Sequence, residues 1–255
     1  MKRIALMFLR SFFNLPLWLW QLHTLCNIEK HDRFERYAWM HRLVPKVNRR
    51  GRVKVECHGQ ENIPKENGFI CFPNHQGMFD ALAIIETCEK PFVTVMKKEV
   101  KDVFLLRNII CLFQAEIIDR EDIRQSMTVI KNMTNRVKAG ENFVIFAEGT
   151  RSRNGNLIGE FKGGSFKSAM NARCPIVPIA LIDSFKAFDT HSIKKLTVQI
   201  HYLKPLYYED YKGMKSHEIA ELVENRIRET IAANTKPEDP ASQYACSKSQ
   251  GISSN

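Results

Sequence analysis

Short apolar runs alternate with longer stretches of helical spacing through most of the chain. The short runs predict strands, because each is apolar or alternating and ends at polar or turn-forming residues. Strands are expected at residues 52–59, 68–72, 92–96, 115–118, 143–146, 175–181 and 196–202, and helices at residues 78–85, 100–113, 121–138, 166–172 and 218–233. This pattern predicts one α/β domain. The prolines within residues 175–181 suggest a strand at a sheet edge or the start of a strand.

The first apolar stretch, Ile4 to Leu25, is interrupted too often for a regular membrane-spanning helix, which needs ~20 mostly apolar residues. Because Pro16 would kink it, we expect a helix, a kink and a second helix lying in the membrane interface, with Trp18 and Trp20 at headgroup depth. Basic residues suited to anionic headgroups follow: Lys30, Arg33, Arg36, Arg42, Lys46, Arg49 and Arg50. A buried core helix with a solvated basic neighbour is the alternative. A signal peptide is disfavoured, since no small-x-small cleavage site follows.

The composition of the chain predicts a basic surface and cysteines that stay reduced. The chain has 255 residues and a net charge of +10, which favours nucleic acid, anionic lipid or phosphorylated substrates as partners. No zinc-finger or RNA-recognition signature is present, so we expect no nucleic-acid partner. The seven cysteines are scattered without a CxxC pair, which indicates reduced thiols in a cytoplasmic compartment and neither disulfides nor a zinc site.

The first candidate for chemistry is the His-x4-Asp pair formed by His75 and Asp80. A buried-strand run precedes it and a helical run follows it. If His75 lies in the turn and Asp80 in the first helical turn, the carboxylate can fold back onto the imidazole. Such a carboxylate fixes the tautomer of the imidazole and makes its other nitrogen a better base. No Ser or Cys lies between them to be activated, so the proton would come from a hydroxyl substrate.

A second polar stretch supports a catalytic role for the His75–Asp80 pair. The apolar run 143–146 ends in Ala147-Glu148-Gly149-Thr150-Arg151-Ser152, so polar groups again follow a strand directly. In an open α/β sheet such strand ends form the ligand crevice.

Asn-His-x4-Asp at residues 74–80, followed by Phe-x-Glu-Gly-Thr-Arg-Ser at residues 146–152, resembles the glycerolipid acyltransferase superfamily. The most similar branch is the 1-acyl-sn-glycerol-3-phosphate (lysophosphatidic acid) acyltransferases, and the resemblance runs from residue 68 to residue 182. The resemblance implies a single mixed-sheet α/β domain flanked by helices, with the N-terminal apolar helical membrane-association element before it. It divides the chain into that element at residues 1–50, a catalytic domain at residues 51–233 and a disordered tail at residues 234–255.

Between the two motifs, Lys97, Glu99 and Arg120 match the family pattern, while the middle of this block departs from it. Phe104 stands in place of a usual Pro, and Arg107 and Gln114 stand where Gly is common. The departure affects the expected shape of the acyl-chain groove.

The implied reaction is acyl transfer from a thioester to the sn-2 hydroxyl of lysophosphatidic acid in phospholipid biosynthesis, at the cytoplasmic face of a membrane. His75 is expected to be the general base, oriented by Asp80, without an acyl-enzyme. Backbone N–H groups near Gly149 or in the Asn74–Gly77 turn are expected to hold the oxyanion. The expected substrate-binding residues are Asn74, Lys97, Arg120, Glu148, Gly149, Thr150 and Arg151.

No cofactor or metal is expected, and acyl-CoA or acyl-carrier protein would be the co-substrate. Three alternatives stay open at this point. The acceptor could be another lysophospholipid or glycerol 3-phosphate, or the chain could be an anionic-lipid-binding membrane protein without turnover. A metal-dependent hydrolase is disfavoured, because His75 lacks a second ligand at metal-binding spacing.

Overall fold

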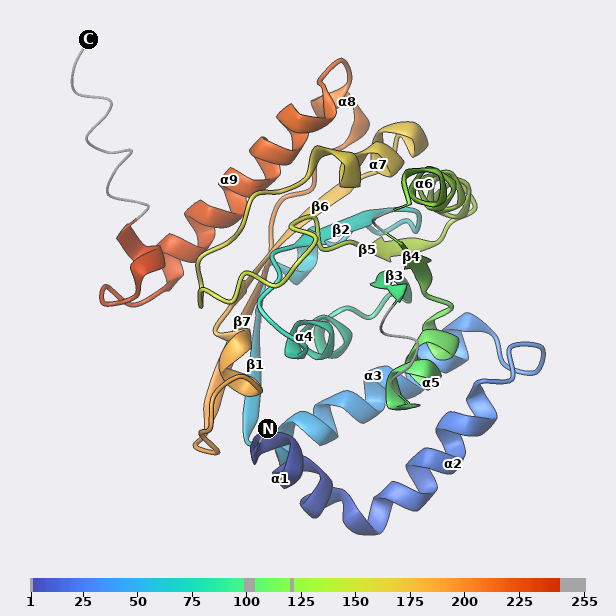
Figure 1. Ribbon diagram of the computed structural model, residues 1–255, viewed down its shortest axis with the longest axis vertical. Helices are drawn as coiled ribbons and strands as arrows, with labels where there is room; N and C mark the ends of the chain where they lie inside the picture. The colour runs from blue at the N-terminus through green and yellow to red at the C-terminus, as the bar shows by residue number, and fades with distance from the viewer. Residues whose placement is uncertain (1, 99–103, 120–121, 244–255) are drawn as a thin grey trace.

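The computed structural model describes residues 2–98, 104–119 and 122–243. Within them, a seven-stranded sheet in the order β1-β7-β6-β2-β5-β3-β4 forms the middle layer (Figure 1). Its strands are β1 (Val53–His58), β2 (Ile70–Pro73), β3 (Phe92–Lys97), β4 (Glu116–Ile118), β5 (Asn142–Val144), β6 (Ile176–Ile182) and β7 (Leu196–Tyr202). Neighbours are parallel except for β6 and β7, which pair antiparallel. The sheet is therefore mixed, as the sequence predicts.

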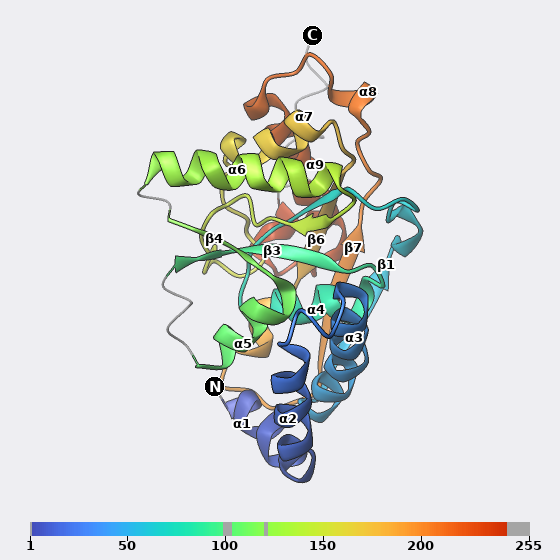
Figure 2. The same ribbon diagram turned by 90° about the vertical axis from the view of Figure 1, so that its right-hand side faces the viewer.

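Helices cover both faces of this sheet (Figure 2). One face carries α1 (Lys2–Ser11), α2 (Leu15–Leu25), α3 (Arg33–Arg50), α4 (Phe79–Thr87) and α5 (Phe104–Phe113). The other carries α6 (Ile123–Lys138), α7 (Lys167–Ala172) and α9 (Ser216–Asn234), and the short α8 (Tyr208–Tyr211) precedes α9. Since strand residues alternate between faces, Cys71 packs into one core cluster while Ile70 and Phe72 pack into the other. Burial on both faces explains why the central strands are continuous apolar runs.

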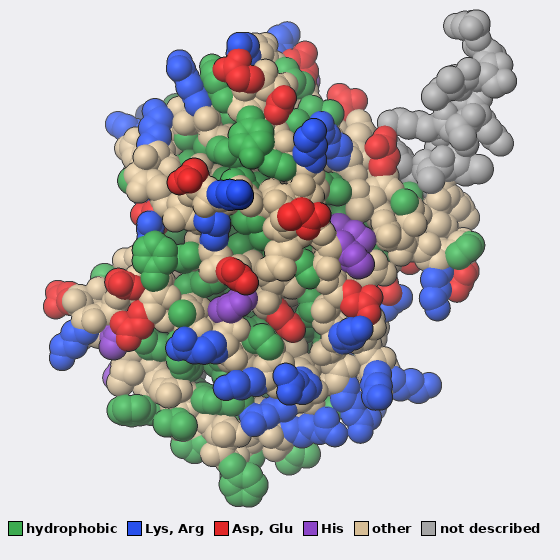
Figure 3. Space-filling model, turned by 180° about the vertical axis from the view of Figure 1, so that it is seen from behind, with side chains coloured by type: hydrophobic (Ala, Val, Ile, Leu, Met, Phe, Trp, Pro, Cys, Tyr) green, Lys and Arg blue, Asp and Glu red, His purple; other side chains and the backbone are tan. Residues whose placement is uncertain are grey.

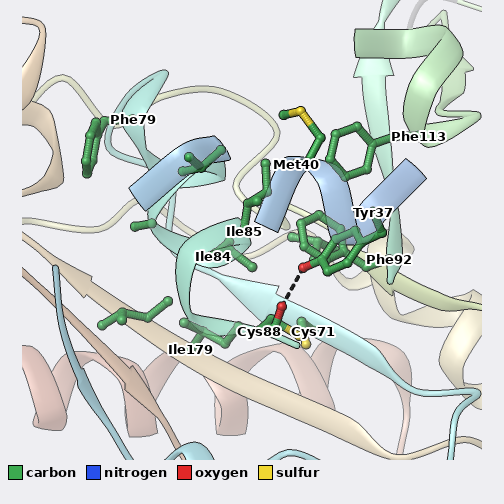
Figure 4. Close-up of a cluster of buried hydrophobic side chains, with 14 of the residues drawn as sticks. Tyr37, Met40, Cys71, Phe79, Ile84, Ile85, Cys88, Phe92, Phe113 and Ile179 are labelled. Carbon is green, nitrogen blue, oxygen red and sulfur yellow. Dashed lines mark hydrogen bonds between the residues drawn. The ribbon is translucent and has the colours of Figure 1, made fainter. Parts of the chain in front are cut away.

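Tyr37 of α3 fastens the N-terminal layer to the core beneath it (Figure 4). Its ring packs edge-on against Phe92 and Phe113, with centroids 5.4 and 6.1 Å away. Its hydroxyl donates to the backbone carbonyl of Cys88 over 2.7 Å, so the one polar atom of the buried ring is satisfied.

Strand β6 corrects one prediction, because it lies inside the sheet between β7 and β2 and not at an edge. Pro178 sits in the middle of this strand. Its carbonyl accepts the N–H of Leu203, so its ring nitrogen faces the same side. The missing N–H of Pro178 therefore lies on the β7 side, where the β6–β7 ladder ends, and the parallel pairing with β2 loses no bond.

The N-terminal segment has the predicted helix–break–helix form, with the short 3-10 turn η1 (Phe12–Asn14) between α1 and α2. Arg3 ties α1 to the domain, and only 1% of its surface is exposed. Its guanidinium donates to the carbonyls of Gly51, Ala187, Ser192 and Lys194 over 2.6 to 3.1 Å. The segment is thus joined to the α/β domain through charge-assisted bonds.

The opposite side of α1, η1 and α2 is apolar and open to solvent. We call this surface the apolar tip; it is formed by Phe8, Leu9, Phe12, Phe13, Leu17, Leu19 and Trp20. Phe13 is 93% exposed and Leu9 75%. A row of Lys and Arg side chains lies beside the apolar tip (Figure 3). Across residues 2–98, 104–119 and 122–243, no helix combines the length and apolarity that crossing a membrane requires.

Two details differ from the expected layout of this region. Arg36, expected among the headgroup-facing residues, is 3% exposed and donates to Asp32, Cys111 and Gln114. At the other end of the chain, residues 235–243 are packed against the domain, and Ala241 in η6 (Pro240–Gln243) is buried.

His201 is a buried titratable group that lies next to the exposed His58. It lies opposite His58 across the β1–β7 ladder, and the two rings stack with centroids 4.5 Å apart. Burial, and to a smaller extent the charge of His58, lower the pKa of His201 to about 4. The unfolded imidazole protonates near pH ~6.5, so the unfolded chain binds more protons between these values.

We expect the free energy of unfolding to fall as the pH is lowered from about 6.5 to about 4, and His201→Gln to weaken this dependence. Denaturant unfolding at several pH values in this window measures it. His191→Gln, at an exposed histidine, is the matched control and should behave as wild type. A parallel loss of stability in wild type and His201→Gln would contradict the assignment.

Candidate active site

The predicted contact between His75 and Asp80 is present at the carboxyl end of β2. The strand ends at Pro73, α4 starts at Phe79, and His75 lies in the turn between them. Asp80, the second residue of α4, folds back so that its Oδ2 is 2.8 Å from His75 Nδ1. The carboxylate places the proton on Nδ1, which leaves Nε2 as the basic nitrogen.

Asp80 has no exposed surface, and both of its carboxylate oxygens accept hydrogen bonds. Its Oδ2 accepts His75 Nδ1 and the N–H groups of Gln76 (2.7 Å) and Gly77 (3.0 Å). Its Oδ1 accepts the hydroxyl of Ser184 at 2.5 Å. These donors offset the cost of burying the carboxylate and hold it in place.

The imidazole of His75 is held on a second side by Phe146. The two rings stack with centroids 4.1 Å apart and planes 29° apart. The His75 side chain keeps 24% of its surface exposed, so a substrate can reach it. Held by Asp80 and by Phe146, the ring has one accessible basic nitrogen in a fixed place.

Glu148 is turned inward and holds the backbone of the His75 turn. It is 7% exposed; Oε1 accepts the N–H of His75 at 2.6 Å, and Oε2 accepts the N–H of Gly159 at 2.8 Å. Burial raises the pKa of Glu148, although these two N–H groups partly oppose that rise. Both carboxylate oxygens are therefore already engaged within the protein.

Asn74 is likewise occupied. It has no exposed surface, its Nδ2 donates to the carbonyl of Leu181, and its Oδ1 accepts the N–H of the same residue. The side chain fastens the end of β2 to β6. It is not available to a substrate, in contrast to the prediction that Asn74 binds one.

The backbone donors that we expected to hold an oxyanion are also engaged. The N–H groups of His75, Gln76 and Gly77 donate to Glu148 and Asp80. The N–H of Gly149 donates to the carbonyl of Phe146 over 3.1 Å. This expectation is wrong for these four N–H groups, because the fold uses them to satisfy two buried carboxylates and a turn.

The remaining predicted residues lie where neighbouring parallel strands end. Strands β2, β5 and β3 are parallel neighbours, so their carboxyl ends share one edge of the sheet. Lys97 ends β3 and is exposed, while Thr150 and Arg151 are exposed in the loop after β5. Arg151 Nη1 lies 4.0 Å from Asp189 Oδ1, which keeps the guanidinium beside the site. Arg120 and Glu99 fall outside the described residues.

Sequence reasoning missed Gln76, Asn156, Ser184 and Asp189. Gln76 Nε2 donates to Asn156 Oδ1, and Gln76 Oε1 accepts the N–H of Ser184. Ser184 carried a usable signal, since it closely follows an apolar strand that runs parallel to β2. Gln76 and Asn156 carried no such signal, because a hydrogen bond between two amide side chains far apart in the chain produces no recognisable sequence pattern.

No group of three or more His, Cys, Asp or Glu side chains in the described part of the chain is arranged to hold a metal ion. The site as described consists of one oriented imidazole, two buried carboxylates and an exposed guanidinium. This arrangement can remove a proton from a hydroxyl and bind an anion nearby.

Known proteins are similar to this chain in sequence and in fold. The model of the acyltransferase family matches residues 54–182. A probable 1-acyl-sn-glycerol-3-phosphate acyltransferase of Mycoplasma genitalium is 30% identical over 74% of this chain and 73% of its own. The 1-acyl-sn-glycerol-3-phosphate acyltransferase of Salmonella typhimurium is 27% identical over 69% of this chain and 74% of its own.

A solved structure has the same fold. The crystal structure of the 1-acyl-sn-glycerophosphate (LPA) acyltransferase PlsC from Thermotoga maritima matches with a TM-score of 0.69 and 19% identity, over 92% of this chain and all of that one. The family match covers half of the chain and both motifs of the site. The chain therefore belongs to the acyltransferase family, beside members named 1-acyl-sn-glycerol-3-phosphate acyltransferases, and it is an O-acyltransferase.

Proposed function

We propose that this enzyme transfers a fatty acyl group from a thioester to the sn-2 hydroxyl of 1-acyl-sn-glycerol 3-phosphate, giving phosphatidic acid. The observation that carries the proposal is the His75 imidazole, whose Nδ1 is fixed by Asp80 while its ring stays reachable. The names of the relatives supply the acceptor, because they describe acylation of 1-acyl-sn-glycerol 3-phosphate.

His75 acts as the general base in this reaction. Its Nε2 takes the proton of the sn-2 hydroxyl as the oxygen attacks the thioester carbonyl. Asp80 stabilises the imidazolium that forms. When the tetrahedral intermediate collapses, the C–S bond breaks and the thiolate leaves, taking the proton from Nε2. No serine or cysteine lies between His75 and Asp80, so the acyl group passes directly to the acceptor.

Basic side chains at the strand ends bind the acceptor phosphate. Arg151 can bind a phosphate through two parallel hydrogen bonds, while Lys97 adds a point charge at the end of β3. Arg120, which matches the family pattern, is proposed to add a third charge. Gly149 and Thr150 shape the loop that presents Arg151, and Gly149 has a φ of 77° that suits glycine. Glu148 and Asn74 contribute by holding the turn and β2 in place.

We propose that the enzyme works on an anionic membrane surface, and the apolar tip with the basic row beside it supports this proposal (Figure 3). The apolar side chains of α1, η1 and α2 enter the interface, and the cations meet the headgroups. This arrangement brings the site to its lipid acceptor. We propose the cytoplasmic face, where acyl-CoA or acyl-carrier protein supplies the acyl group and free thiols stay reduced.

His75→Ala is expected to lower kcat by about 10²- to 10⁴-fold, because the general base is lost. Release of free thiol from an acyl-CoA in the presence of lysophosphatidic acid measures it, with acyl-carrier protein as the second donor. His191→Ala should retain wild-type activity. Full activity in a folded His75→Ala variant would refute the base role. Wild-type protein that binds liposomes but consumes neither donor would refute the proposed reaction.

Arg151→Ala is expected to raise KM for lysophosphatidic acid by about 10- to 100-fold, because a charge-assisted bond to the phosphate is lost. Arg153→Ala is the matched control, since Arg153 is exposed in the same loop. Equal effects of the two substitutions would show that only the general charge of the loop matters. Faster turnover of lysophosphatidylcholine or glycerol 3-phosphate than of lysophosphatidic acid would reassign the acceptor.

Leu9→Asp and Phe13→Asp together are expected to reduce binding to phosphatidylglycerol vesicles, because both side chains would have to carry a charge into the interface. Flotation of protein with vesicles measures the bound fraction. Met127→Asp is the control, as Met127 is 66% exposed on α6, away from the apolar tip. Unchanged binding by the double variant would remove the apolar tip from the membrane contact.

A further inference from the structure

Ser184 is the first residue of the 3-10 turn η5 (Ser184–Ala187), and its side chain has no exposed surface. Its hydroxyl lies 2.5 Å from Asp80 Oδ1, while Asp80 Oδ2 faces His75. We infer that Ser184 is a positioning residue for acyl transfer, whose hydroxyl keeps the Asp80 carboxylate in the plane that aims Oδ2 at His75 Nδ1. The inference rests on the proposed role of His75 as the base.

The hydrogen-bond pattern around Asp80 shows what the hydroxyl adds. An ionised carboxylate only accepts, so Ser184 is the donor. The N–H groups of Gln76 and Gly77 fix the position of Oδ2. The torsion about the Cβ–Cγ bond is broad for aspartate, and it moves both oxygens together. The hydroxyl of Ser184 holds this torsion from the Oδ1 side, opposite the donors on Oδ2.

The backbone turn before Ser184 is held in the conformation that points this hydroxyl at Asp80. Asp183 has a φ of 63°, a conformation that costs a non-glycine residue energy. The turn is held by Asn156, which accepts the N–H of Asp183 and donates to its carboxylate, both over 2.8 Å. Gln76 Oε1 then accepts the N–H of Ser184 over 2.8 Å. A strained turn held by side chains from the His75 turn and from another loop indicates a role at this site.

Ser168 provides a matched comparison within the same molecule. It is also completely buried, on α7, but its hydroxyl has no hydrogen-bond partner among the residues that the structure describes. Ser168→Ala and Ser184→Ala therefore make the same chemical change at the same burial. They differ in whether a carboxylate loses its donor.

We expect Ser184→Ala to lower kcat by about 10- to 100-fold, because the carboxylate can turn away from His75. KM for both substrates should stay unchanged, since Ser184 touches neither. Ser168→Ala should keep wild-type kcat. Ser184→Thr, which keeps the hydroxyl, should retain more activity than Ser184→Ala, with thermal unfolding of each variant as the check on folding. Wild-type kcat in Ser184→Ala would overturn the inference.

A double-mutant cycle separates positioning from general support of the fold. In an Asp80→Asn background, Ser184→Ala should no longer lower kcat, because the carboxylate it positions is absent. The same fold-loss in both backgrounds would overturn the inference. Activity that survives in His75→Ala would instead overturn the base role, so the two failures are distinguishable.

Discussion

The buried Asp80 carboxylate is the constraint on which the rest of the site depends. A charge without solvent is costly unless each oxygen has donors, and here the donors come from the turn after β2 and from η5. These segments must converge for the fold to be stable. The orientation of His75 follows from this requirement, because its imidazole is one of the donors that the carboxylate needs.

Glu148 complements Asp80 from the other side of the same histidine. Asp80 holds the ring of His75, whereas Glu148 holds its backbone N–H. An acidic side chain in the loop that we propose to bind phosphate would repel the ligand if it faced it. In the structure the Glu148 carboxylate points inward and accepts two backbone N–H groups, whereas the side chain of Arg151 is exposed to solvent.

The sequence predicted most of the fold because strands buried on both faces leave unbroken apolar runs. It also predicted the His75–Asp80 contact, since a turn followed by a helix start allows only a few arrangements. Its position after an apolar strand marks Ser184 as a candidate, but the sequence does not say that its hydroxyl meets Asp80, 104 positions away. Pro178 was misleading because its missing N–H faces β7, where the ladder ends, and leaves the pairing of β6 with β2 intact. The prediction for Arg36 was wrong because a positive charge does not reveal whether the guanidinium will donate to protein oxygens or to water.

Arg3 has a consequence for the order in which the molecule is assembled. Three of its four carbonyl partners lie 184 to 191 positions later in the chain. During synthesis, α1 can meet α3 and the carbonyl of Gly51 early, but three of the four carbonyl partners of Arg3 are made only when the chain reaches residues 187 to 194. The buried guanidinium therefore gains its full set of acceptors late, and the docking of α1 is completed only after most of the sheet has been synthesised.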